Sequence, residues 1–132
     1  MFNNQRGVKS LLQGVRGLHA WRRRVQQCPD VPNLWCAPAT IDLAGAEIEL
    51  VSLVARETRL DKALQSYLED CDDAGDRIDY VLIDCPPSLG LLTVNALVAA
   101  THLLIPIQSS YFALEGTDDL LETIEKVRQR PN

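Results

Sequence analysis

The chain has 132 residues, which suits one domain or part of one, because compact domains most often hold about 100–150 residues. Its composition, 46% hydrophobic and 23% charged, is that of a globular protein. No apolar run approaches the ~18–20 residues of a membrane span, and no secretory signal pattern is visible. The sequence therefore predicts a cytoplasmic protein with no membrane partner.

Charge divides the chain near residue 30. Residues 1–30 hold six basic side chains and one acid, whereas residues 31–132 hold seven basic side chains and seventeen acids. Within residues 9–25, apolar side chains recur at helical spacing among arginines. This segment is either an arm for DNA or anionic lipid, or an ordinary solvated helix or leader of different origin. We predict a basic leader over 1–30 and a separate domain over 31–132.

The cysteines Cys28, Cys36, Cys71 and Cys85 form no CxxC pair and have no histidine cluster nearby. Zinc ligands usually come in closely spaced pairs, so no zinc site is expected. In a chain of this size, such scatter is typical of reduced cytoplasmic thiols.

The first half of the domain reads as a strand followed by two helices. "NLWCAP" (33–38) is predicted to be a short buried strand that ends at Pro38. The run 40–57 is predicted to be a helix, capped by Thr40 or Asp42. Its apolar stripe is predicted to consist of Ala44, Ile48, Val51 and Ala55. A second helix is predicted through Leu60, Leu64, Tyr67 and Leu68, and the acidic run 69–79 is predicted to be a surface loop.

The second half alternates strands and helices. "YVLID" (80–84) and "HLLIPIQ" (102–108) are predicted to be buried strands, with a helix between them through Leu92, Ala96 and Ala99. The last helix is predicted to open with Thr117 as N-cap and to close with basic residues, which suits the helix dipole. Its buried face is predicted to be Leu120, Leu121, Ile124 and Val127.

This order predicts an α/β fold with a parallel sheet covered by helices, because continuously apolar strands are buried on both faces. Ligands of such sheets bind beyond the carboxyl ends of the strands. Asp84 lies at that edge, as does the loop "QSSYFALEG" (108–116). A carboxylate in this place is either a magnesium-nucleotide ligand or a helix N-cap.

Three blocks of the sequence carry a resemblance to a known family. They are "APATIDLAGAEIELVSLVARETRL", "YVLIDCPPSLGLLTVNAL" and "LLIPIQSSYFALEGTDDLLETIEKVR". In this order they closely resemble the ParA/Soj partitioning ATPases, a deviant Walker A group of P-loop NTPases. The resemblance covers roughly residues 31–130, and residues 1–30 do not match it convincingly. It implies a parallel-sheet P-loop NTPase fold of the SIMIBI/ParA type.

The resemblance also implies roles for particular residues. Asp84 matches the Walker B aspartate, which holds Mg²⁺ through a water molecule, and Cys85, Pro86, Pro87 and Ser88 match the switch II segment. The family binds ATP with Mg²⁺, dimerises, binds DNA without sequence specificity, and responds to a ParB-type centromere-binding protein. A cytoplasmic, nucleoid-associated location follows from the same resemblance.

Two family motifs are not found in these 132 residues. Phosphate binding in the family uses "KGGVGKT", whose glycines let backbone N–H groups form a cradle. The nearest stretch, "NNQRGVKSLLQ" (3–13), resembles that loop with two glycines removed, and it is read as a remnant or as chance. "DxDPQ", which carries the aspartate tied to hydrolysis, does not occur, so no catalytic residue is assigned. We therefore expect a partial domain without the P-loop strand and the C-terminal elements, and we expect flanking DNA to encode them.

The predicted function is that of a ParA/Soj-type partitioning protein, for a chromosome or a plasmid, without ATPase activity of its own. Two alternatives stay open. One is a non-catalytic module that pairs with intact ParA subunits and modulates them. The other is an active ATPase that uses "QRGVKS" as an unusual phosphate loop or is completed by another chain.

Overall fold

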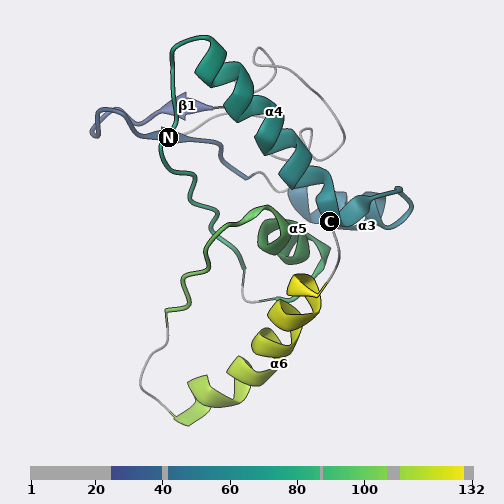
Figure 1. Ribbon diagram of the computed structural model, residues 1–132. Helices are drawn as coiled ribbons and strands as arrows, with labels where there is room; N and C mark the ends of the chain where they lie inside the picture. Colours follow the sequence, from purple (N-terminus) through teal and green to yellow (C-terminus); the bar gives the residue numbers. More distant parts are fainter. Residues whose placement is uncertain (1–24, 40–41, 87, 107–110, 130–132) are drawn as a thin grey trace.

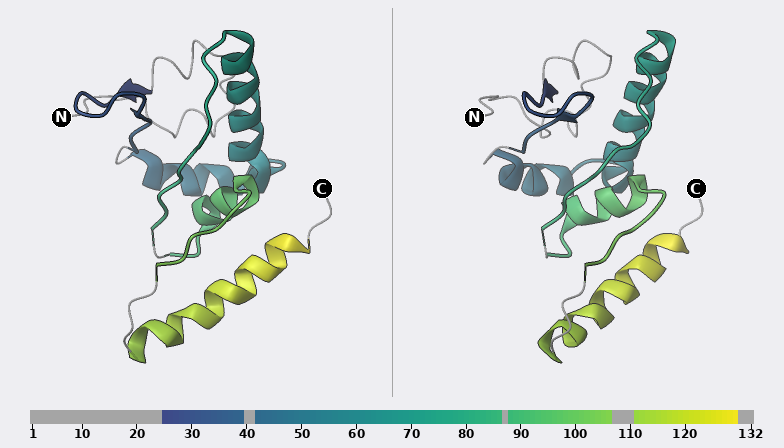
Figure 2. Two further views of the ribbon diagram at one scale, coloured as in Figure 1. Left: turned by 60° about the vertical axis from the view of Figure 1, so that its left-hand side comes forward. Right: turned by 90° about the vertical axis from the view of Figure 1, so that its left-hand side faces the viewer.

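The computed structural model describes residues 25–39, 42–86, 88–106 and 111–129 (Figure 1). Helices α3, α4 and α5 meet in the middle of the molecule, and α6 lies next to α5 on the side away from α4 (Figures 1 and 2). No helix in these ranges is long and apolar enough to cross a membrane. In chain order the elements are β1 (Gln26–Gln27), β2 (Trp35–Cys36), α3 (Asp42–Val51), the 3-10 helix η1 (Arg56–Thr58), α4 (Arg59–Asp73), α5 (Leu91–Ala99) and α6 (Tyr111–Arg128).

Strands β1 and β2 form a small antiparallel hairpin. Gln26 lies opposite Cys36 in the register. The amide of Cys28 donates a hydrogen bond to the carbonyl of Leu34 at 2.8 Å, which closes the turn. Asn33 has a φ of 65° in this turn, a left-handed conformation that asparagine adopts more readily than most residues. The predicted strand over 33–38 is therefore present but only two residues long. The prediction that it is buried was wrong, because Trp35 is 57% exposed on this small hairpin.

The apolar core lies at the junction of α3, α4 and α5. Leu50 of α3, Leu60 of α4 and Ala96 of α5 are buried together. Burying one leucine side chain contributes roughly 1.5–3 kcal/mol, so this junction is the main apolar contribution to the described fold. Partly buried side chains pack around it: Leu43, Leu53, Leu64, Ile83, Leu91, Leu92 and Ala99.

Helix α3 faces the core with a different set of residues from the predicted one. Ala46 and Leu50 are buried, whereas Ile48 and Val51 of the predicted stripe are exposed. The helix also ends at Val51, and Ala55 lies beyond it with a left-handed φ of 53°. The predicted stripe was wrong because α3 carries apolar residues on two faces, and only packing against α5 decides between them.

Helix α4 is longer than predicted. It continues to Asp73, through the start of the run that we expected to be a loop. Its end is closed by backbone hydrogen bonds from Gly75 to Asp72 at 3.0 Å and from Asp76 to Cys71 at 2.9 Å. Gly75 has a φ of 76°, the conformation in which glycine commonly ends a helix.

The predicted parallel sheet is not formed within the described ranges. There the sheet consists of β1 and β2, and residues 76–86 and 103–106 run between helices without regular secondary structure (Figures 1 and 2). A strand requires a neighbour with which it forms a hydrogen-bonded ladder. Within the described ranges, 80–84 and 102–106 form no such ladder, so the prediction of strands over 80–84 and 102–108 was wrong there. Tyr80, Leu82 and Leu104 are 88%, 92% and 90% exposed, so these apolar runs are not buried on both faces. Residues 107 and 108 lie outside the described ranges.

Helix α6 starts earlier than predicted. It begins at Tyr111, so Thr117 lies inside the helix and is not its N-cap. The predicted basic end is confirmed, with Lys126 and Arg128 in the last turn, where positive charge suits the helix dipole. Leu121 of the predicted buried face is exposed, whereas Leu120, Ile124 and Val127 are partly buried.

Candidate functional site

Asp84 lies at the end of the apolar run 80–83, in the segment that joins α4 to α5. Ile83, the residue before it, is partly buried and packs against the core. The side chain of Asp84 itself is exposed. The core therefore anchors the chain at Ile83 and presents the next carboxylate to solvent.

The residues after Asp84 are also on the surface. Cys85, Pro86 and Ser88 are exposed, and Pro87 lies outside the described residues. The Cys85 thiol donates a weak hydrogen bond to the carbonyl of Ile83 at 3.8 Å. Partial desolvation of the sulfur raises the pKa of Cys85, and the adjacent Asp84 carboxylate raises it further. The thiol is therefore less ionised at neutral pH than an ordinary cysteine.

The first turn of α5 is held by a carboxylate from α3. The Oε1 atom of Glu47 accepts a hydrogen bond from the amide of Leu91, the first residue of α5, at 2.6 Å. A helix N-terminus leaves amide groups without intrahelical partners and carries positive potential, so an acidic partner there is favourable. One turn further on, the Thr93 hydroxyl donates to the carbonyl of Ser88 at 2.6 Å. These contacts attach the end of the 84–90 segment to α3 and α5.

Asn95 of α5 is a buried polar link to η1 and α4. Its side chain is 0% exposed. Its amide nitrogen donates to the carbonyls of Arg56 at 2.8 Å and Leu91 at 2.9 Å. Its amide oxygen accepts from the backbone N–H of Leu60 at 3.2 Å. Buried polar atoms are costly when unpaired, and here both ends of the amide are satisfied.

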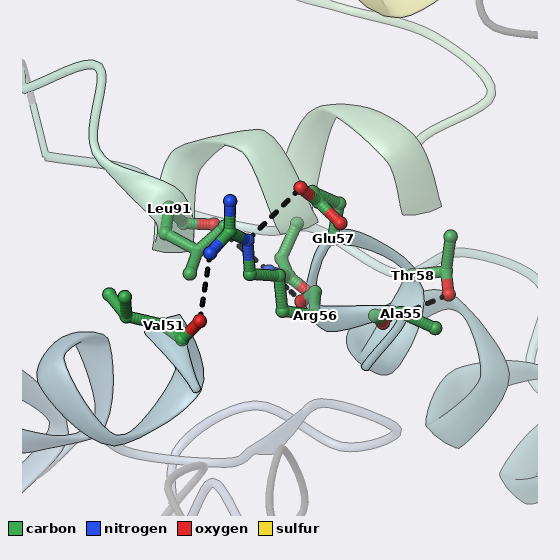
Figure 3. A network of polar contacts seen from close by, with 7 residues as sticks. Val51, Ala55, Arg56, Glu57, Thr58 and Leu91 are labelled. Atoms are coloured by element: carbon green, nitrogen blue, oxygen red, sulfur yellow. Dashed lines mark hydrogen bonds and ion pairs between the residues drawn. The ribbon is translucent and has the colours of Figure 1, made fainter. Parts of the chain in front are cut away.

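Arg56 connects the end of α3 to η1 (Figure 3). Its guanidinium donates to the carbonyl of Val51, the last residue of α3, at 2.8 Å, and pairs with Glu57 at 3.2 Å. Figure 3 also draws Leu91 of α5, whose carbonyl, like that of Arg56, accepts a hydrogen bond from the side-chain amide of Asn95. A cation at a helix C-terminus suits both the orphan carbonyls and the dipole. The short turn between α3 and α4 is thus fixed by polar contacts next to the start of α5.

The exposed carboxylate of Asp84 suits a water-mediated contact with Mg²⁺, not direct binding of the free ion. In the described ranges, no group of three or more His, Cys, Asp or Glu residues is placed to hold a metal ion. Mg²⁺ keeps several waters and is usually bound through one or two carboxylates together with substrate phosphates. One exposed carboxylate can therefore meet the hydration shell of a nucleotide-bound Mg²⁺, but it cannot hold the free ion tightly.

Sequence reasoning found the exposed residues of this site but missed those that support it. The structure places Asp84, Cys85 and Ser88 in one surface run, and their Walker B and switch II roles stay predictions. It also shows that Glu47 and Asn95 both bind the backbone of Leu91, three residues after Ser88; the sequence analysis singled out neither side chain. A signal for Asn95 was present, because it and Thr93 are the two polar residues in the helix 91–99. For Glu47 the sequence holds no comparable signal.

Comparison with known proteins finds one family model and several chromosome-partitioning proteins that are similar to this chain. A family model described as an AAA domain matches residues 4–132. The sporulation initiation inhibitor protein Soj of Bacillus subtilis is 51% identical over 102 residues, covering 77% of this chain and 38% of that protein. The chromosome-partitioning ATPase Soj of Treponema pallidum is 48% identical over 125 residues, covering 95% and 45% respectively. The chromosome partitioning protein ParA of Myxococcus xanthus is 52% identical over 99 residues, covering 75% and 32%.

One solved structure is similar to this chain in both backbone and sequence. A crystal structure of cobyrinic acid a,c-diamide synthase from Mycobacterium smegmatis, with a bound ATP analogue and magnesium, matches with a TM-score of 0.77 and 37% identity. The match covers 96% of this chain and 47% of that one. The chain thus spans less than half the length of each of these four proteins. The match to the family model begins at residue 4 and so includes most of residues 1–30. The division of the chain into a leader over 1–30 and a domain over 31–132 stays a prediction.

Proposed function

The chain belongs to the ParA/Soj family of chromosome-partitioning ATPases and has a P-loop NTPase fold, and from this premise we propose that it acts in the segregation of a chromosome or plasmid. The observation that supports this best is the roughly one-half sequence identity to Soj and ParA proteins over about three quarters of the chain, 51% over 102 residues for the Bacillus subtilis protein. The proposed setting is the cytoplasm, at the nucleoid. The proposed partners are a ParA-type subunit, a ParB-type centromere-binding protein and non-specific DNA.

Within this function, Asp84 is the Walker B aspartate. Its exposed carboxylate would accept a hydrogen bond from a water molecule of a nucleotide-bound Mg²⁺. The metal would supply charge neutralisation for the nucleotide's phosphates. Residues 85–88 would serve as the switch II segment, since they join Asp84 to the first turn of α5. Cys85, Pro86 and Ser88 are exposed and so are accessible to a nucleotide or a second subunit.

The 132-residue chain is proposed to bind ATP weakly and not to hydrolyse it alone. These residues contain neither a "KGGVGKT" loop nor "DxDPQ". The phosphate cradle is built from backbone N–H groups of such a loop, and one outer-sphere contact from Asp84 cannot replace it. We expect a dissociation constant no tighter than about 1 mM, which corresponds to roughly −4 kcal/mol.

Calorimetry and NMR with the purified chain test the weak affinity for ATP and the role of Asp84. Titration of Mg-ATP into the millimolar range should shift the amide signals of Asp84, Cys85 and residues 88–90, without saturation below about 1 mM. Asp84→Asn should remove that response, and Asp118→Asn, which makes the same chemical change at an exposed site on α6, should keep it. Micromolar magnesium-dependent binding would contradict the weak affinity. An unchanged response in Asp84→Asn would contradict the role of Asp84.

A non-catalytic module that pairs with an intact ParA subunit is the second candidate. The exposed apolar side chains of Tyr80, Leu82 and Leu104 favour it, because apolar surface of this kind is commonly covered by another chain. This candidate predicts that the chain, inactive alone, changes the DNA-stimulated ATPase rate of a full-length Soj protein. An unchanged rate at saturating chain concentration would exclude it.

A further inference from the structure

The start of α5 is stabilised from outside its own sequence neighbourhood. Gly90 occupies the N-cap position, where serine, threonine or aspartate would usually accept a hydrogen bond from the first turn, and it makes no side-chain cap. Glu47 of α3 supplies the acceptor instead, through its 2.6 Å contact with the Leu91 amide. A residue from a different helix thus takes the place of the missing cap.

Gly90 is what allows the Glu47 carboxylate to approach. A Cβ atom built at position 90 would overlap the Oε1 atom of Glu47 and would lie 3.0 Å from its Cδ atom. The φ and ψ of Gly90, −74° and −179°, are ordinary extended values, so the backbone conformation does not require glycine. A methyl group at this position would instead push aside the flexible Glu47 carboxylate and so break its hydrogen bond to Leu91.

The same contact lies at the end of the segment that begins with Asp84. Thr93 holds the carbonyl of Ser88 at 2.6 Å, and Asn95 holds the carbonyl of Leu91 at 2.9 Å. Ile83 packs against the core at the other end of the segment. The exposed residues between these attachments are therefore constrained at both ends, and Glu47 is the attachment that comes from α3.

We propose that Glu47 is a positioning residue for the Asp84 segment: its carboxylate, admitted by Gly90, fixes the end of the segment, at Gly90 and Leu91, against α3. Displacement of this end by a nucleotide or a partner must then either break the Glu47–Leu91 hydrogen bond or move α3 with it. Glu47 touches neither nucleotide nor metal in this role. The inference rests on the proposed function for the role of residues 84–88 in nucleotide or partner binding. The contact between Glu47 and Leu91 does not depend on that role.

Amide hydrogen exchange of the full 132-residue chain, measured by mass spectrometry without nucleotide, tests the proposal. Glu47→Ala should accelerate exchange in a peptide covering 84–92 by about tenfold, because a charge-assisted hydrogen bond is lost there. A peptide covering 60–71 of α4 should keep its wild-type rate. Glu47→Gln keeps an acceptor oxygen at the same length and should restore most of the protection. Glu69→Ala, at an exposed position of α4, is the matched control and should change neither peptide.

A second set of variants addresses the contact itself. Gly90→Ala should loosen 84–92 as Glu47→Ala does, and the double variant should be no looser than Glu47→Ala alone, because the added methyl group then has room. If Glu47→Ala does not fold, Glu47→Asp gives the same comparison with a carboxylate one methylene shorter. Unchanged exchange in 84–92, or equal acceleration in both peptides, would overturn the proposal. Since no nucleotide is present, this result is independent of the Mg-ATP titration of Asp84.

Discussion

Replacement of Asn95 by alanine should be among the most damaging single changes in the described fold. The substitution removes three hydrogen bonds, to Arg56, Leu91 and Leu60, from a side chain that is 0% exposed. Each is worth about 1 kcal/mol, and leaving the Leu60 amide unsatisfied adds a desolvation cost of the same order. Alanine regains about 0.5 kcal/mol in helix propensity. The net loss is about 3–4 kcal/mol.

Thermal denaturation followed by circular dichroism, at one fixed chain concentration, measures this loss. A loss of about 3–4 kcal/mol should lower the midpoint by roughly 10–20 °C in a domain of this size. Gln65→Ala is the control, because the hydrogen bond that it removes is an exposed one, from the Gln65 amide to Asp61 at 2.9 Å within α4. Its midpoint should stay within about 3 °C of wild type. If Asn95→Ala behaved like the control, the buried amide would not be a structural link, and the reasoning from its three partners would fail.

Other parts of the structure lead to three further predictions. The wild-type chain should self-associate in sedimentation experiments, since Leu82 and Leu104 are 92% and 90% exposed, and replacing both by lysine should raise the monomer fraction; a monodisperse wild-type monomer would contradict this. Gly90→Ala should destabilise the chain by about 1–3 kcal/mol, because the new methyl group displaces Glu47, and the effect should largely vanish in a Glu47→Ala background. Iodoacetamide at mildly alkaline pH should alkylate Cys85 more slowly in the folded chain than in urea, because its folded pKa is raised. The folded state binds the Cys85 thiol proton more tightly than the unfolded state. The stability that this binding contributes is therefore complete below the ordinary thiol pKa and is lost as pH rises through the raised pKa of the folded state. Equal alkylation rates in the folded chain and in urea would refute the raised pKa.

Local patterns in the sequence predicted the helices well where the apolar side chains leave one choice of face. The stripe through Leu60 and Leu64 indicated α4, and the basic residues Lys126 and Arg128 marked the end of α6. The start of α6 was missed because Thr117 has the chemistry of an N-cap but lies in the middle of a helix that begins at Tyr111. Propensity describes what a residue favours locally, and a longer helix can include such a residue at small cost.

The errors in the strands and in α3 have a different origin. Whether 80–84 forms a strand depends on a neighbour for its ladder, and no local pattern supplies that information. Whether Leu50 or Ile48 faces inward depends on where α5 packs. At the site, Asp84 was predicted because its motif is continuous in the sequence. Its support from Glu47 could not be predicted, because that contact joins residues that are 44 positions apart.

The sequence distance across these polar contacts has a consequence for synthesis of the chain on the ribosome. Leu91 pairs with Glu47 across 44 positions, and Asn95 pairs with Arg56 and Leu60 across 39 and 35. Translation at about 5–20 residues per second places several seconds of elongation between the first partners and the last. In the last part of that interval α3, η1 and α4 have been synthesised, but the apolar face of Leu50 and the amide of Leu60 still await α5. Codons or pauses that delay residues 91–99 should therefore prolong the time in which the nascent chain is recognised by chaperones.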